Sequence, residues 1–153
     1  MQNFLTTLIF VCLLTSFKTG EPDATLICKS ESGRTIFTAD FPSCSYLNNA
    51  ELSIDGSKLY FSEEDKSYIV FDPDNKVFTV FLESKSNNPK SYKFLQFWAL
   101  PATFKKVKSE KGPGTEFHDV YEFHGKVYAT DPRNTGNSNT KTIELICTLD
   151  YQL

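Results

Sequence analysis

Apolar and polar residues alternate along short segments throughout residues 21–153. The clearest segment lies near the end of the chain, where every second residue is apolar: Ile143, Leu145, Cys147 and Leu149. A period of two is that of a β-strand, so this segment predicts a strand that buries one face and places Cys147 inward. Similar segments, rich in β-branched and aromatic residues, predict strands over residues 25–29, 35–39, 50–54, 57–61, 68–71, 77–82, 116–123, 126–130 and 141–149.

Turn residues separate the predicted strands. Asp55-Gly56 predicts a two-residue hairpin, because a tight hairpin turn needs positive φ angles that Asp and Gly tolerate. Residues 72–75 (Asp-Pro-Asp-Asn) predict the turn of a second hairpin. Residues 92–104 combine a rough helical spacing with a heavy aromatic load and Pro101, which together favour a strand that ends in a turn.

These elements predict a mostly β fold: a single-domain antiparallel β-barrel or β-sandwich of about eight strands with few helical turns. Residues 21–153 suffice for one domain with its own hydrophobic core, and no linker or internal repeat divides them. If the first and last strands pair, closure into a barrel is favoured, because closure removes exposed strand edges.

Residues 1–20 predict a secretory signal peptide with a cleavage site near Gly20. Within it, residues 5–14 form an apolar run that is too short to span a membrane, which takes about 20 residues. Residues 1–4 carry no Lys or Arg, which leaves a buried or amphipathic N-terminal helix as the alternative. Cleavage would leave residues 21–153 as one exported β domain without a transmembrane segment, either secreted or periplasmic.

Three cysteines follow the predicted signal peptide: Cys28, Cys44 and Cys147. Disulfides persist outside the cytoplasm, so we expect one bridge and one free thiol. Cys28 and Cys147 lie in similar Leu-Ile-Cys segments of the first and last strands, and their pairing would close a loop of about 120 residues. This pairing is favoured, and Cys28–Cys44 is the alternative.

The formal net charge of the chain is -3 at pH 7, so we expect no nucleic-acid partner, which requires a concentrated basic face. One basic cluster occurs, and Glu110 interrupts it: Lys105, Lys106, Lys108 and Lys111. Exposed charge runs of this kind are common, and a solvated turn explains the cluster better than an anion site does.

A candidate metal site lies in residues 116–124. On a straight strand four potential ligands share one face: Glu116, His118, Glu122 and His124. Imidazole and carboxylate groups suit zinc or copper. However, His118 and His124 would lie about 20 Å apart along such a strand, so a solvent-facing polar strand is the favoured interpretation. A metal site, if one forms, would use His118 and Glu116 with a ligand from another strand.

No catalytic or cofactor motif occurs in the sequence. The motifs G-x-S-x-G, H-E-x-x-H and a glycine-rich phosphate loop are absent, so the sequence does not indicate hydrolysis or nucleotide binding. Residues 72–75 begin like a calcium loop but lack its later glycine and glutamate. Cys44 could act as a nucleophile with His118 or His124 as its base, but an unpaired thiol more commonly packs as a small apolar residue. We therefore expect no enzyme activity and no cofactor.

These features favour an exported, non-enzymatic protein that binds a partner, which is a protein, a glycan or a small ligand. The expected contact residues are exposed tyrosines, which combine apolar area with a polar tip: Tyr46, Tyr60, Tyr68 and Tyr92. The alternatives are a metal-binding protein centred on His118, a structural or envelope-associated protein, and an inhibitor of a secreted enzyme such as lysozyme. Lysozyme-inhibiting barrels share the plan of signal peptide, β body and a cysteine near each end, but their inhibitory loop motifs are not recognisable here.

Overall fold

The computed structural model describes residues 23–153 except 43, 87, 89–90, 115 and 134–138. The predicted signal peptide, residues 1–20, lies outside the described residues. The elements are β1 (Asp23–Lys29), β2 (Thr35–Pro42), β3 (Asn49–Ile54), β4 (Ser57–Ser62), β5 (Lys66–Asp72), β6 (Val77–Glu83), β7 (Phe94–Ala99), the 3-10 turn η1 (Pro101–Thr103), β8 (Lys105–Lys111), β9 (Phe117–Thr130) and β10 (Thr140–Gln152). The predicted mostly β fold is confirmed, with ten strands in place of about eight. None of the described segments is a helix with the length and apolar character needed to cross a membrane.

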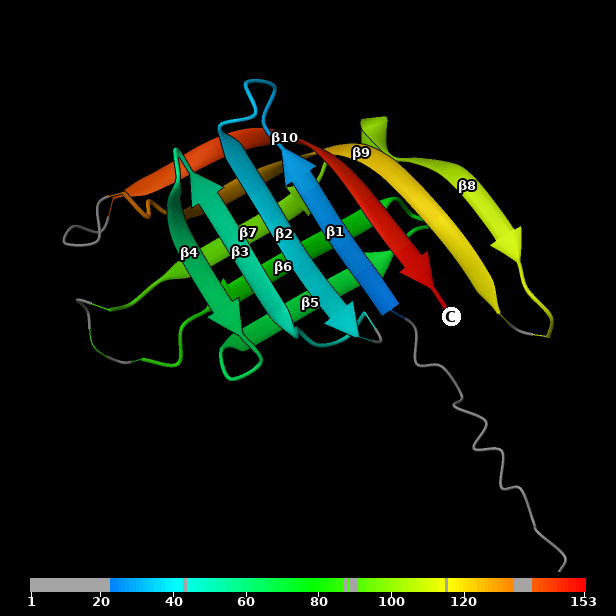
Figure 1. Ribbon diagram of the computed structural model, residues 1–153, viewed down its shortest axis with the longest axis horizontal. Coiled ribbons are helices and arrows are strands. Elements are labelled where there is room, and N and C mark those ends of the chain that lie inside the picture. The colour runs from blue at the N-terminus through cyan, green and yellow to red at the C-terminus, as the bar shows by residue number, and fades with distance from the viewer. Residues whose placement is uncertain (1–22, 43, 87, 89–90, 115, 134–138) are drawn as a thin grey trace, which may run out of the picture.

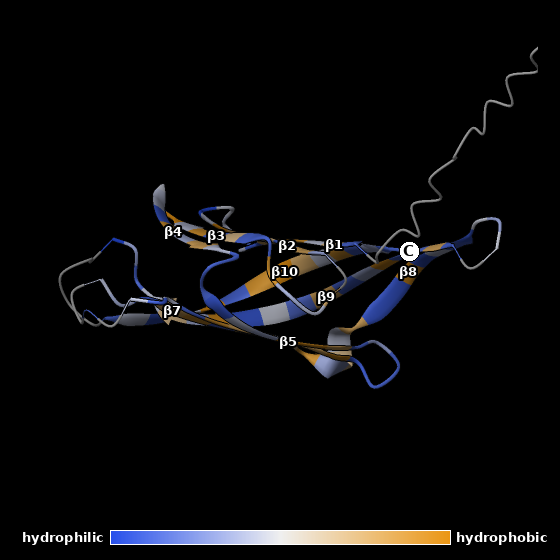
Figure 2. Ribbon diagram, turned by 90° about the horizontal axis from the view of Figure 1, so that it is seen from below, coloured by the Kyte–Doolittle hydropathy of each residue, from blue (hydrophilic) through white to orange (hydrophobic). Residues whose placement is uncertain are grey.

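All ten strands belong to one antiparallel sheet, in the order β4-β3-β2-β1-β10-β9-β7-β6-β5, and β8 pairs with the first half of β9. The sheet curls into a half-barrel, because the long strands β9 and β10 bend from a front layer (β1 to β4) to a back layer (β5 to β7) (Figure 1). The strands of the two layers cross at a steep angle, and Figure 2 shows the layers edge-on. The end strands β4 and β5 do not pair with each other, so hydrogen bonds do not close the barrel.

The terminal strands β1 and β10 are neighbours, with Cys28 directly opposite Cys147. The two residues form a disulfide, which is the first of the two pairings that the sequence suggests. Both cysteines face the core, because burial alternates residue by residue along β1 and along the second half of β10.

Phenylalanine rings fill the space between the layers. Phe37 of β2 packs against Phe97 of β7 with ring centroids 5.5 Å apart, and Phe41 meets Phe78 edge-on at 5.8 Å. All four rings are fully or almost fully buried. This aromatic content explains how a thin two-layer sheet buries a continuous core, since each ring removes a large apolar area from water.

The structure corrects the prediction of two strands over residues 116–123 and 126–130. Strand β9 runs without interruption from Phe117 to Thr130. Gly125, which falls between the two predicted strands, lies inside β9, where a Cβ atom would come within 2.5 Å of the ring of Phe97. The glycine therefore permits a close approach between β9 and the core, and it does not end the strand.

The prediction of a solvated turn over residues 105–111 is also wrong. These residues form β8, an edge strand that is exposed along its whole length and pairs only with β9. Lysines are common on edge strands because their charge opposes pairing with another chain. The strand that was expected to end near Pro101 is confirmed as β7 followed by η1.

The predicted Asp55-Gly56 hairpin is confirmed, with φ angles of 50° and 85° between β3 and β4. The carboxylate of Asp55 pairs with Arg34 at 2.9 Å and with Arg133 at 2.8 Å. Arg133 also binds both carboxylate oxygens of Asp131, which lowers the pKa of Asp131 to about 2. These ion pairs connect the β1–β2 turn, the β3–β4 turn and the β9–β10 connection at one end of the sheet.

Candidate functional site

The four side chains suggested as metal ligands do not converge. The ring of His118 lies 3.0 Å from Asp150, whereas the ring of His124 lies 3.5 Å from Glu144. The suggested ligands face solvent at separate points: Glu116 just before β9, and His118, Glu122 and His124 on its outer face. In the part of the chain that the structure describes, no group of three or more His, Cys, Asp or Glu side chains is placed to hold a metal ion.

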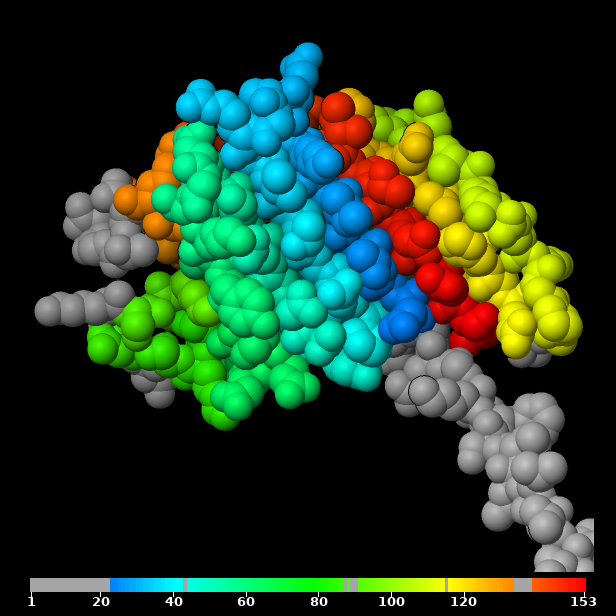
Figure 3. All heavy atoms as spheres, in the orientation of Figure 1, coloured from blue at the N-terminus to red at the C-terminus, as the bar shows by residue number. Residues whose placement is uncertain are grey.

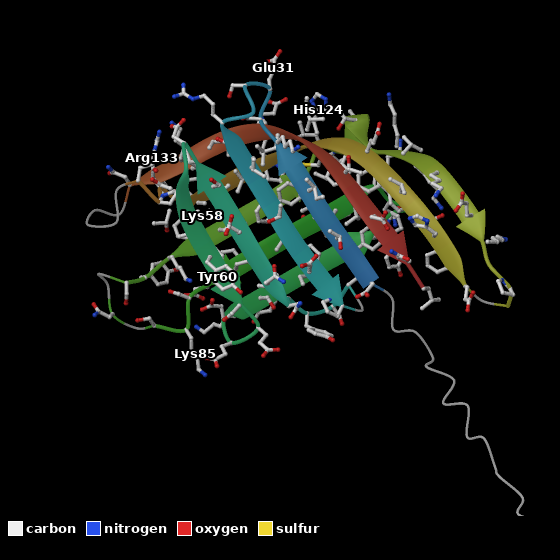
Figure 4. All side chains as sticks on the ribbon, in the orientation of Figure 1. Glu31, Lys58, Tyr60, Lys85, His124 and Arg133 are labelled. Atoms are coloured by element: carbon white, nitrogen blue, oxygen red, sulfur yellow. A yellow bond between two sulfur atoms is a disulfide. The ribbon has the colours of Figure 1, made fainter. Side chains whose placement is uncertain are left out.

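Two adjoining depressions open on the outer face of the sheet over β9 and β10, and both are lined by His124 and Ile146. The first, about 390 Å³, extends toward η1 and is bordered by Lys105 and Glu122. The second, about 460 Å³, extends toward the β1–β2 turn and is bordered by Glu31. Figure 4 shows Glu31 and His124 projecting from the same end of the molecule. We call the two depressions together the outer depression.

Hydrogen bonds to β9 place η1 beside the outer depression. The backbone N–H of His124 donates to Thr103 Oγ1 at 2.8 Å, and the N–H of Leu100 donates to the carbonyl of His124 at 2.7 Å. These bonds hold both ends of the turn against the strand. One wall of the depression is therefore built on ordered backbone, which is the condition for a preformed binding surface.

Strand register brings three isoleucines together beside the depression. Ile36, Lys29, Ile146 and His124 are consecutive partners across β2, β1, β10 and β9. Ile27, two residues before Lys29, adds a third isoleucine to the same face. Ile27, Ile36 and Ile146 are 45%, 37% and 54% exposed, and we call them the isoleucine patch. Figure 3 shows this outer face, with β1, β2 and β10 side by side at its centre.

An ionic cluster under β8 holds that strand against β9. Lys106 Nζ lies 2.7 Å from Asp119 Oδ2, and the hydroxyl of Tyr121 donates to the same oxygen at 3.1 Å. A register shift between Lys106 and Lys108 interrupts the β8–β9 pairing, and bulges of this kind re-aim side chains. The ammonium group of Lys106 reaches the inner cluster, while Lys105 borders the outer depression.

Asp119 is buried, at 7% exposure, and sequence reasoning did not single it out. Burial raises the pKa of Asp119, but hydrogen bonds from Lys106, Ser109 and Tyr121 outweigh burial and lower the pKa overall. Among the described residues, no donor lies within hydrogen-bond distance of its Oδ1 atom. The hydrogen bond to Asp119 raises the pKa of Lys106 in turn. Both groups thus stay charged near neutral pH, which suits an anchor and not a proton-transfer group.

In the part of the chain that the structure describes, Cys44 is the cysteine outside the disulfide. Burial, followed by the charge of Asp23, raises the pKa of its thiol to about 12. A thiol that stays protonated is a poor nucleophile, so the electrostatics do not support the suggested role of Cys44 in catalysis.

The exposed tyrosines lie apart from the outer depression, on the β2–β3 connection, β4, β5 and the segment before β7: Tyr46, Tyr60, Tyr68 and Tyr92. The isoleucine patch was missed because its members stand next to buried apolar residues. In Leu26-Ile27-Cys28 and Leu145-Ile146-Cys147, an apolar residue occupies the outward position between two inward ones. This local break in the alternation is the signal that could have identified the patch.

Comparison of the chain with protein-family models, curated proteins and solved structures finds no match.

Proposed function

We propose that this protein is an exported domain that acts by binding a partner protein, and that the isoleucine patch and the outer depression form the docking surface. The observation that carries the proposal is the grouping of three partly exposed isoleucines on adjacent strands. Groups of exposed apolar side chains on a small protein often mark interaction sites.

The surroundings of the patch favour a protein partner. Charged side chains of both signs border the outer depression beside it, including Lys105, Glu122 and Glu144, and Lys29 lies between Ile36 and Ile146 at one side of the patch. An apolar centre with a polar rim is the usual anatomy of a protein–protein interface. A small ligand is bound instead in a concave site that covers most of its surface. The outer depression is open to solvent, and a depression beside an apolar patch suits a side chain projecting from a partner.

The disulfide between Cys28 and Cys147 supports export. Disulfides are stable in oxidising compartments outside the cytosol and are rare in cytosolic proteins. The predicted signal peptide supports the same compartment. The raised pKa of the Cys44 thiol disfavours the one nucleophile that the sequence suggested, which agrees with binding without catalysis.

Site-specific photo-crosslinking tests the docking surface. A benzophenone amino acid at Ile146 should give one covalent protein adduct when the protein is irradiated in an extract of the native compartment that contains it. The matched position is Tyr92, which is 41% exposed against 54% for Ile146 and precedes β7 in the back layer. Ile27→Glu should abolish the adduct at Ile146. Equal adducts at both positions, or none at Ile146, would contradict the proposal.

The mass of the protein from its native compartment tests export separately. Cleavage predicts a chain that starts near residue 21, with one disulfide and one alkylatable thiol. A chain that retains residues 1–20 with all its thiols reduced would remove the export premise and leave the docking surface to be judged by crosslinking alone.

A further inference from the structure

Among the described residues, three strands pair with one neighbour each and therefore have one free edge: β4, β5 and β8. Strand β8 carries two features that oppose pairing with another chain, a cluster of lysines and a bulge. Strand β5 has seven regularly paired residues with no proline and no register shift. It also exposes Tyr68 and Val70, at 71% and 54%. An apolar, regular edge strand is a template for strand pairing.

The outward face of β5 reads Lys66, Tyr68, Val70 and Asp72 from start to end. This order is complementary to itself when two such strands run antiparallel with Ile69 opposite Ile69. Lys66 then lies opposite Asp72 of the partner subunit, and Tyr68 lies opposite Val70 of the partner subunit. Opposite charges and aromatic–β-branched pairs are both favourable cross-strand pairs.

We infer that β5 pairs antiparallel with β5 of a second copy of this chain, about a two-fold axis at Ile69. The pairing uses the strand over its full length, from Lys66 to Asp72. Centring the pair on Tyr68 would instead place Asp72 opposite Glu64 of the partner subunit, where two like charges meet. Charge complementarity therefore favours a second copy of this chain as the partner of the free β5 edge, paired in the register that places Ile69 opposite Ile69.

The existing contacts of the two charged residues leave them accessible. Lys66 Nζ lies 3.5 Å from Glu83, and the side chain of Lys66 is 61% exposed. Asp72 accepts hydrogen bonds from Asn75, which lower the pKa of Asp72 and keep it charged. Both ends of the strand thus present a full charge to the partner subunit.

The dimer would join the back layers of two subunits into a continuous sheet. Strand β5 is the outermost strand of the back layer, whereas the isoleucine patch lies on β1, β2 and β10 (Figure 1). A dimer through β5 therefore leaves both docking surfaces free, so it would offer two sites to a multivalent partner. The inference stands independently of the proposed function.

Charge reversal at the two ends of β5 tests the pairing on the mature, oxidised chain. Sedimentation equilibrium should show a monomer–dimer equilibrium for the unaltered protein. Lys66→Glu alone and Asp72→Lys alone should each weaken dimerisation about tenfold, because each places two pairs of like charges across the contact. An equimolar mixture of the two variants should restore the dimer, since every charged pair is then opposite.

The matched control is Lys58→Glu on β4, another edge-strand lysine, with 60% side-chain exposure against 61% for Lys66. This control should dimerise like the unaltered protein. The inference is overturned by a monomer at all concentrations, by equal weakening in the control, or by a mixture that stays monomeric while both variants keep the native circular dichroism spectrum.

Discussion

Replacement of Gly125 by alanine should destabilise the protein by forcing β9 away from the core. The new Cβ would lie 2.5 Å and 2.6 Å from two ring carbons of Phe97, where ordinary contacts are at least 3.4 Å. The ring cannot move aside freely, because Phe97 is fully buried and its centroid lies 5.5 Å from that of Phe37 and 5.8 Å from that of Phe78. Overpacking of this kind costs about 1–3 kcal/mol. The smaller conformational entropy of the unfolded alanine chain returns about 0.4–1 kcal/mol.

The net loss of about 1–2 kcal/mol should lower the thermal unfolding midpoint by about 4–8 °C in differential scanning calorimetry. Glu122→Ala is the matched control: it lies three residues earlier in the same strand at an exposed position, so it places no new atom against the core and should change stability little. A double-mutant cycle with Phe97→Leu should recover part of the loss, because the leucine lacks the clashing ring carbons. A Gly125→Ala protein as stable as the original, or strict additivity in the cycle, would refute the reasoning.

Three further outcomes follow from the covalent and electrostatic contacts. Cys28→Ser should lower the free energy of unfolding, measured in urea, by about 4–5 kcal/mol, because the disulfide to Cys147 closes a loop of about 120 residues. If reductant destabilised this variant as much as the unaltered protein, the disulfide would not be the cause. Arg133 lowers the pKa of Asp131 from 3.8 to about 2, so the stability from this pair is complete above pH 3.8 and is lost as the pH falls through about 2. As the pH is lowered through this window, the thermal unfolding midpoint should therefore fall less steeply for Arg133→Met than for the unaltered protein. Cys44, with its pKa raised to about 12, should react with Ellman's reagent at pH 8 far more slowly in the native protein than in urea, and equal rates would show that its burial is absent in solution.

Much of the fold was predictable from local patterns. The alternation in residues 141–149 predicted an inward Cys147, and Asp55-Gly56 predicted a tight hairpin, because both features depend on residues within a few positions of each other. The two errors arose where a distant element decides the local structure. Residues 105–111 become a strand because β9 offers a free edge beside them, and Gly125 stays within β9 because the ring of Phe97 occupies the space where its side chain would lie.

The candidate site was much less predictable than the fold. Ile36 of β2 and Ile146 of β10 are far apart in the chain. They share a face only because both strands flank β1, where Lys29 is the partner of each residue. The suggested metal ligands were grouped by spacing along one strand, but the residues beside His118 and His124 come from neighbouring strands. Sequence spacing cannot give those neighbours without the register.

The sequence by itself determined the class of secondary structure, the inward position of Cys147 and the positions of the Asp55-Gly56 and 72–75 turns, because these follow from side-chain periodicity and backbone sterics. The tertiary structure alone decided the order of the strands, the burial of Asp119 beneath Lys106, and the grouping of the isoleucine patch. These features depend on long-range pairing, in which a shift of one residue would turn every side chain of a strand to the opposite face.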